Sequence, residues 1–197
     1  MTGGLRERKK LEARTAMSEA ALRVALTDGL RAVTAEVVAD AVRLSPRTFR
    51  NYFSSVEEAV VDGLVVRGTA LIDALEARPD DEPVWESLCS VVPEHVDRIA
   101  GDREDATGLF EMFEGSAALR AYQLAAFEEL DLRLADVLAA RLGVDRAADP
   151  TPTLVAGVVM VAVKAAVELW VRGHGVSLPE VTLDCLRRIR AGLPTNP

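Results

Sequence analysis

The sequence predicts an all-α protein. Hydrophobic residues make up 49% of the 197 residues, aromatic residues only 5%, and Ala, Leu, Val and Arg dominate the chain. Alanine and leucine favour helices, and few runs have the character of strands. A chain of this length forms one large domain or two small ones and buries a sizeable core. We therefore expect about nine helices.

Two helices are expected before the first turn of interest. The first covers about residues 5 to 28 and stops at Gly29, a residue that suits the C-terminal end of a helix. Thr34 then caps a short second helix, because its hydroxyl can accept a hydrogen bond from a free N–H group of the first turn. Arg43 and Leu44 form the turn that follows.

Two further helix starts are marked by side-chain chemistry. Ser45 caps the third helix and Pro46 suits its first position, because the proline ring fixes a helical φ and lacks an N–H group. Ser55 and Glu58 have the spacing of a capping box, in which each side chain bonds the other residue's N–H group. The fourth helix should cover about residues 56 to 77.

The rest of the chain predicts five more helices, separated by Pro- and Gly-containing breaks. They are expected at about residues 83 to 100, 104 to 114, 117 to 142, 151 to 172 and 177 to 191.

The third helix has two different faces. Phe49 and Phe53 are four residues apart and share one face, which suits burial. At about 100° per residue, the opposite face and its flanks carry hydrogen-bonding side chains: Arg47, Thr48, Arg50 and Asn51. Such a helix suits the DNA major groove, where Arg pairs with guanine and Asn with adenine. An ordinary surface helix with a solvated polar face is the alternative.

Residues 6 to 60 resemble the N-terminal domain of TetR-family transcriptional regulators, over a little more than a quarter of the chain. The features that carry the resemblance, besides a basic lead-in, are Ala20-Ala21-Leu22, Asp28-Gly29, Thr34, Ala39, Ser45, Thr48-Phe49 and Tyr52-Phe53. The resemblance implies a helix-turn-helix DNA-binding domain over residues 1–55 and a helical regulatory, ligand-binding and dimerisation domain over residues 56–197. It also implies a homodimer that represses from a palindromic operator and is released by an unknown small molecule.

The candidate DNA-binding residues surround the predicted helix-turn-helix: Thr34, Arg43, Ser45, Pro46, Arg47, Thr48, Arg50, Asn51 and Tyr52. Arg47 and Asn51 are the expected base readers. Hydroxyl and backbone N–H groups at the helix starts suit phosphates, and so does the Tyr52 hydroxyl. An N-terminal arm adds sequence-independent attraction or is merely a solubilising segment; its cations are Arg6, Arg8, Lys9, Lys10 and Arg14.

Two positions depart from the family pattern. Relatives commonly have Gly where this chain has Arg43, so a non-Gly residue is expected to take a positive φ there. They also commonly carry a Lys that meets a DNA phosphate where this chain has Val56. Val56 has no charge for that contact, which Arg43 can partly replace.

Charge is distributed unevenly along the chain. The net charge is −8, yet residues 1 to 53 hold ten Lys or Arg against six Asp or Glu, and the remainder holds 13 against 25. A basic head on an acidic body localises phosphate attraction at one end, although chance unevenness remains the alternative.

The helix predicted over residues 151 to 172 is apolar on most sides. Such a helix must be buried in a core or against another subunit, and the TetR resemblance implies pairing of the last two helices with those of a second copy. Lys164 and Glu168 interrupt the apolar run, so we expect no membrane span. The charged N-terminus predicts no signal peptide, and we expect a cytoplasmic protein.

Large side chains of the body are candidates for binding the small molecule: Trp85, Phe110, Met112, Phe113, Tyr122, Phe127, Met160 and Lys164. Simple core packing, with Lys164 and Glu168 as a surface ion pair, is the alternative for each.

No catalytic residue, metal site or cofactor is expected. His95 and His174 are the only histidines and neither lies near a nucleophile motif, while Cys89 and Cys185 lack metal spacing and read as buried free thiols. An enzyme is therefore disfavoured. A helical dimer that acts through protein contacts without specific DNA binding remains the alternative function.

Overall fold

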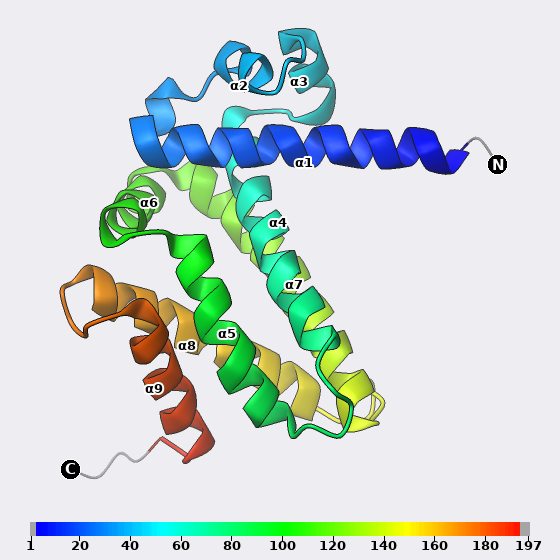
Figure 1. Cartoon of the computed structure of the whole chain (residues 1–197), viewed down its shortest axis with the longest axis vertical. Helices are drawn as coiled ribbons and strands as arrows, with labels where there is room; N and C mark the ends of the chain where they lie inside the picture. The colour runs from blue at the N-terminus through cyan, green and yellow to red at the C-terminus, as the bar shows by residue number, and fades with distance from the viewer. Residues whose placement is uncertain (1–2, 194–197) are drawn as a thin grey trace. The chain divides into compact units, whose positions relative to one another are not determined.

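The computed structural model describes residues 3–193, and these residues form α-helices, one short 3-10 helix and no strand (Figure 1). The helices are α1 (Gly3–Asp28), α2 (Ala35–Ala41), α3 (Pro46–Tyr52), α4 (Val56–Glu76), α5 (Val84–Ala100), α6 (Arg103–Gly115), α7 (Ala117–Leu142), α8 (Thr151–Val171) and α9 (Leu178–Arg190), with the 3-10 turn η1 (Leu30–Ala32). The predicted all-α fold with about nine helices is confirmed.

The chain divides into two compact units, which we describe separately. The first comprises the chain through Val66 together with Thr107–Ala126, and the second comprises Arg67–Ala106 and the chain from Phe127 onward. The first unit therefore takes in the start of α4 and parts of α6 and α7 besides the helix-turn-helix. The functional boundary after residue 55 stays a prediction.

Each short helix of the first unit begins where its capping residue predicts. The Oγ1 of Thr34 accepts a 3.1 Å hydrogen bond from the Val37 N–H group. The Oγ of Ser45 accepts a 3.0 Å bond from the Thr48 N–H group, and Pro46 occupies the first position of α3. These caps satisfy donors that the helix itself leaves free.

The turn between α2 and α3 needs a left-handed residue, and Arg43 supplies it with a φ of 56°. The Leu44 N–H group bonds the Ala39 carbonyl at 2.8 Å and the Arg43 N–H group bonds the Asp40 carbonyl at 3.0 Å. This pair of bonds is a Schellman motif, which normally favours glycine at the left-handed position. The predicted positive φ at Arg43 is confirmed.

The core of the first unit forms where α1 meets the other helices. Met17 and Leu22 of α1 and Val38 of α2 are fully buried, and Figure 1 shows α2 and α3 on the same side of α1. Gly63 lets α4 approach α1 closely, because a Cβ there would lie 2.6 Å from the Ser18 carbonyl oxygen. The absence of a side chain at Gly63 therefore sets the spacing of these two helices.

The capping box at the start of α4 forms in an altered way. Ser55 Oγ accepts a 3.0 Å bond from the Glu58 N–H group, as predicted. The Glu58 carboxylate, however, accepts 2.7 Å and 2.6 Å bonds from the N–H group and the hydroxyl of Ser54, not from the Ser55 N–H group. The reciprocal bond is thus displaced by one residue.

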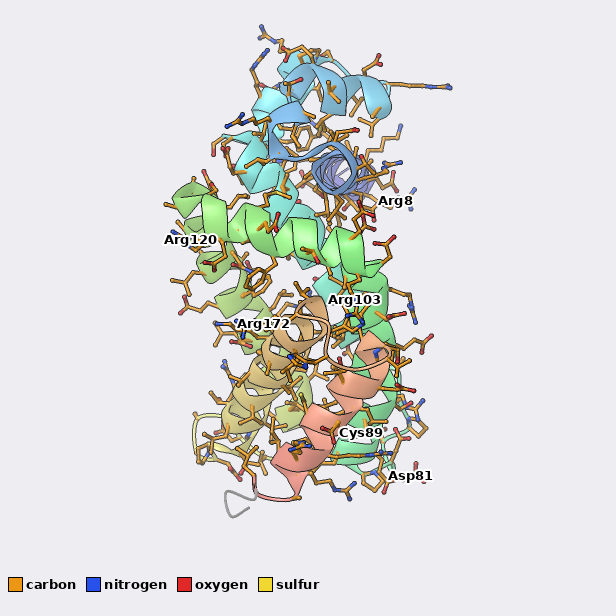
Figure 2. All side chains as sticks on the ribbon, turned by 90° about the vertical axis from the view of Figure 1, so that its left-hand side faces the viewer. Arg8, Asp81, Cys89, Arg103, Arg120 and Arg172 are labelled. Carbon is orange, nitrogen blue, oxygen red and sulfur yellow. The ribbon has the colours of Figure 1, made fainter. Side chains whose placement is uncertain are left out.

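In the second unit, α9 packs against both α5 and α8. Leu178 and Leu186 of α9 are fully buried, as are Leu88 and Val92 of α5. The guanidinium of Arg103 lies 4.9 Å from the centre of the Trp170 ring near the end of α8 (Figure 2). This stacking ties the start of α6 to α8.

Within one chain, α8 is buried on one side only. Its small residues, such as Ala156 and Ala162, are buried, whereas Leu154, Val161 and Leu169 are 63%, 65% and 42% exposed. The expected burial on most sides is therefore not met by this chain alone, and an apolar face remains exposed.

By length and composition alone, α8 qualifies as a membrane span. It has 21 residues and a mean hydropathy of 2.1 in its most apolar window. This differs from the expectation that Lys164 and Glu168 would exclude it. Because a core helix of a globular protein passes the same test, the distinction must come from other observations.

The two cysteines are free thiols, as predicted, but half-buried rather than buried. Cys89 lies on α5 (Figure 2) and Cys185 on α9. Burial raises the pKa of both thiols, so at neutral pH both remain protonated and weakly nucleophilic.

Candidate DNA-binding site

Two phenylalanines seat the third helix. Phe49 and Phe53 are 2% and 3% exposed, and their ring centres lie 5.3 Å apart. Their predicted burial on one face is confirmed. Since each buried aromatic side chain contributes a large apolar area, this contact fixes which face of α3 points outward.

The outward face carries the two expected base readers. Arg47 and Asn51 are both exposed. Neither side chain makes a hydrogen bond or an ion pair with any other residue that the structure describes. Their donors and acceptors are therefore available to a partner outside the chain, as base recognition requires.

Arg50 has a partner that sequence reasoning missed. Its Nη2 lies 2.7 Å from an oxygen of Glu36 on α2, and both side chains are 62% exposed. An exposed ion pair of this kind contributes little free energy, about 0–1 kcal/mol. Arg50 can exchange Glu36 for a DNA phosphate or base at small cost, but it starts from an occupied state.

The hydroxyl groups at the two helix starts are occupied by capping. Thr34 caps α2 and Ser45 caps α3, and Ser45 Oγ also lies 2.8 Å from Thr48 Oγ1. Thr48 is half-buried, whereas Thr34 and Ser45 are exposed. The Thr34 hydroxyl can still donate to a phosphate while its lone pairs hold the cap, and so can one hydroxyl of the Ser45–Thr48 pair, because the bond between them uses only one of their two protons.

An open groove brings the N-terminal arm to the end of the recognition helix. It has a volume of about 690 Å³ and is lined by Arg6, Glu7, Lys9, Lys10, Asn51 and Tyr52. All of these lining residues except Glu7 are expected DNA-binding side chains of the arm or of α3, and Tyr52 among them is half-buried. Arg8, labelled in Figure 2, pairs with Glu12 at 3.5 Å on the exposed surface.

Arg14, grouped by sequence with the cations of the N-terminal arm, is bound to other residues of the first unit. Its Nε and Nη2 donate to Asp62 Oδ1 at 3.1 Å and 2.7 Å, and its Nη1 donates to the Tyr52 carbonyl at 2.9 Å. The position of Arg14, about three turns into α1, directs its side chain toward α4. Only the tertiary structure reveals this, because the sequence shows the same basic residue type throughout the arm.

The two departures from the family pattern lie where they were expected. Val56 is the first residue of α4 and is half-buried, so this position offers no cation. Arg43 is exposed in the turn before α3. The turn therefore presents a positive charge that a glycine would lack.

The candidate ligand-binding residues are divided between the two units. Phe110, Met112, Phe113 and Tyr122 belong to the first, and Trp85, Phe127, Met160 and Lys164 belong to the second. Phe113 is buried and the others are half-buried, except that Lys164 is exposed and lies 3.8 Å from Glu168. Their role as a ligand site stays a prediction.

The helix-turn-helix, its exposed polar face and the basic groove beside it define a DNA-binding regulator. Comparison with known proteins gives the same class. Residues 82–194 match the family model described as the MftR C-terminal domain, a TetR C-terminal domain. The chain is also 33% identical over 161 residues to the HTH-type transcriptional regulator TcmR of Streptomyces glaucescens, covering 79% of this chain and 71% of TcmR. The chain belongs to the TetR family of transcriptional regulators.

Solved structures of the family share the fold. A TetR-family regulator from Streptomyces coelicolor matches with a TM-score of 0.63 and 17% identity, over 91% of this chain and 79% of that one. The Thermus thermophilus repressor FadR, in complex with lauroyl-CoA, matches with a TM-score of 0.61 and 21% identity, over 93% and 96% of the two chains. Because α8 lies wholly within residues 82–194, it is a helix of the TetR C-terminal domain rather than an added membrane segment.

Proposed function

We propose that this protein is a cytoplasmic homodimeric repressor that binds a palindromic operator and is released by a small molecule. Membership of the TetR family makes it a DNA-binding regulator; the direction of regulation, the dimer and the ligand are the proposal. One observation is the main support for sequence-specific DNA binding. Arg47 and Asn51 stand exposed and unpaired among the described residues, on a helix that two buried phenylalanines hold in place.

Arg47 and Asn51 have complementary chemistry toward bases. A guanidinium donates two parallel hydrogen bonds to the O6 and N7 atoms of guanine, and a carboxamide bonds the N6 and N7 atoms of adenine. Four residues apart on α3, they reach neighbouring base pairs of one major groove. The arm residues along the groove add contacts to phosphates, which raise affinity without selecting a sequence.

The exposed face of α8 supports a homodimer. Leu154, Val161 and Leu169 lie along one side of this helix and are exposed in the single chain. Burying such a face against a second copy removes apolar area from water, at roughly 25 cal/mol per Å². A two-fold dimer presents two copies of α3, which accounts for a palindromic operator.

A small molecule is proposed to bind in the helical body. The Thermus thermophilus FadR structure, which has the same fold, is a complex with lauroyl-CoA, and this supports the proposal of a ligand in the helical body. The candidate residues in this chain are mainly aromatic side chains and methionines, which suit an apolar ligand of unspecified structure. Coupling of about 1–3 kcal/mol between ligand and operator would change operator affinity 5- to 150-fold.

Selection of binding sites from random duplex DNA tests the operator proposal. The wild-type protein should enrich one palindrome, and Arg47→Ala and Asn51→Ala should each lose about 1–3 kcal/mol of discrimination at one base position in each half-site. Arg98→Ala, at an exposed position of α5 in the second unit, is the matched control and should enrich the same palindrome. The alternative, a helical dimer that acts through protein contacts, predicts that no sequence is enriched.

Sedimentation tests the dimer. Val161→Glu places a charge on the exposed apolar face of α8 and should shift the protein to a monomer, because an unpaired buried charge is costly. Leu124→Glu is the control, since Leu124 is a 75% exposed leucine on α7 in the first unit. A dimer that persists in Val161→Glu would exclude this face as the interface.

A further inference from the structure

We infer that Arg14 is a positioning residue for specific DNA binding, which holds the recognition helix α3 against α4 and does not itself contact DNA. The inference rests on the proposed operator binding. It assigns to Arg14 a role opposite to the one that its place in a basic N-terminal segment indicates.

The guanidinium of Arg14 joins three helices of the first unit. From α1 it donates to the carbonyl of Tyr52, the last residue of α3, at 2.9 Å. Its other nitrogens donate to Asp62 on α4 at 2.7 Å and 3.1 Å and lie 3.6 Å from Glu58. The plane of donors in arginine can serve all these acceptors at once, which a lysine ammonium cannot do in the same geometry.

The contact with Tyr52 acts on the end of the recognition helix. The last carbonyls of a helix have no partner within the helix and carry a partial negative charge. A cation at this end is therefore favourable, and a hydrogen bond there fixes where the helix stops. The guanidinium also lies 4.6 Å from the centre of the Phe53 ring, one of the two aromatic rings that seat α3. Arg14 thus holds both the backbone end and the buried anchor of α3.

The burial and the charged neighbours of Arg14 indicate a structural role for its guanidinium rather than a cation free to bind a phosphate. The side chains of Arg14 and Asp62 are 34% and 20% exposed, whereas Arg8 in the arm is 69% exposed. Burial alone would lower the pKa of Arg14, but the hydrogen bond and charge of Asp62 and the charge of Glu58 outweigh it and raise the pKa. Two carboxylates face one guanidinium, so the cluster offers a phosphate no net positive charge.

A chain of hydrogen bonds extends the same cluster to the segment between α3 and α4. Glu58 accepts from the N–H group and the hydroxyl of Ser54, the second residue after α3. Burial would raise the pKa of Glu58, but these bonds and Arg14 outweigh it and lower the pKa, so the carboxylate stays ionised at neutral pH. The segment between α3 and α4 is therefore held at Tyr52 by Arg14 and at Ser54 by Glu58. Movement of α4 relative to α1 must break this set of bonds or carry α3 with it.

Two variants separate positioning from phosphate contact, because they change charge in opposite directions. Arg14→Gln removes one positive charge, and Asp62→Asn removes one negative charge. If Arg14 positions α3, both variants should weaken binding to the palindrome selected by the wild-type protein, by about 10- to 100-fold. If Arg14 contacts a phosphate, Asp62→Asn releases it and should strengthen binding to any DNA.

The salt dependence of binding gives an independent readout. A lost phosphate contact reduces the slope of log affinity against log salt by about 0.9. Arg8→Gln in the arm should show that reduction, with the ratio of specific to non-specific affinity unchanged. Arg14→Gln should keep the wild-type slope while the ratio falls by about tenfold or more. Arg98→Gln in the second unit is the control for net charge and should change neither quantity.

Arg14→Lys serves as a second variant in case Arg14→Gln fails to fold. It keeps the positive charge, and circular dichroism and the melting temperature establish that the protein is folded before DNA is added. A folded Arg14→Lys protein with a reduced specific ratio and an unchanged salt slope supports the inference. A wild-type ratio in both Arg14 variants, or tighter DNA binding by Asp62→Asn, overturns it. Failure of the wild-type protein to enrich any sequence overturns the proposed function and this inference with it.

Discussion

The hydroxyl of Tyr122 on α7 lies 3.2 Å from the hydroxyl of Ser54, which directly precedes the cap of α4. Both residues belong to the first compact unit, so this bond connects α7 to the exit of the helix-turn-helix within one body. Tyr122 was a candidate for the ligand site on grounds of residue type. Its position makes it equally suited to link α7 to the DNA-binding helices.

The coupling between Tyr122 and Ser54 can be measured with a double-mutant cycle. Tyr122→Phe should lower the free energy of unfolding by about 0.5–1.5 kcal/mol, because it removes one hydrogen bond at a partly exposed site. Ser54→Ala should lower it by more, because it also removes the bond from the Ser54 hydroxyl to Glu58. The double variant should lose less than the sum, since the shared bond is counted once. Urea unfolding provides the measurement, and strictly additive losses would show that the two hydroxyls do not interact.

Replacement of Glu36 should make Arg50 available to contact DNA. Glu36→Gln breaks the pair with Arg50 and removes a negative charge beside the recognition helix. We expect affinity for non-specific duplex DNA to rise about two- to fivefold, and the salt slope to steepen by about 0.9 as Arg50 gains a phosphate. Glu94→Gln is matched, since Glu94 pairs with Arg98 at 2.7 Å on α5. Equal effects from both variants would assign the change to net charge alone.

Gly63 should not tolerate a methyl group. A Cβ at Gly63 would lie 2.6 Å from the Ser18 carbonyl oxygen and 2.8 Å from the Leu22 Cβ, so Gly63→Ala must push α4 away from α1. We expect a loss of about 1–3 kcal/mol in the free energy of unfolding. Gly108→Ala in α6 is the control, because a Cβ at Gly108 would have no described side chain or distant backbone within 4 Å. That variant should gain up to about 1 kcal/mol from helix propensity.

Lowering the pH should reduce the stability of the second unit, because Glu82 becomes protonated. The hydrogen bond from Arg78 and that from the Ser87 hydroxyl hold the pKa of Glu82 at about 2, below its ordinary value. A carboxyl group with a lowered folded pKa stabilises the fold above its unfolded pKa of about 4.3, and this contribution is lost as the pH falls toward 2. Glu82→Gln and Arg78→Gln should both flatten the dependence of the urea midpoint on pH in that range. An unchanged dependence in either variant would contradict this assignment.

Local sequence chemistry was sufficient to predict the short helices of the first unit. Thr34 and Ser45 cap their helices through a hydroxyl that reaches the N–H group three residues later, so the signal and its effect lie within one turn. The burial of Phe49 and Phe53 followed from helical spacing in the same way. The predicted partner of the Glu58 carboxylate was wrong by one residue. Ser54 and Ser55 have equivalent N–H groups, and tertiary contacts determine which of the two is bound.

The sequence by itself determined that the chain is helical, where its helices begin, and which face of α3 carries hydrogen-bonding side chains, because these depend on neighbours a few residues apart. Only the tertiary structure decided that Arg14 is bound to Asp62 and Tyr52, that Arg50 is paired with Glu36, and that one side of α8 remains exposed. These depend on residues 14 to 48 positions apart in the chain, and on the packing of whole helices, for which charge and periodicity carry no local signal.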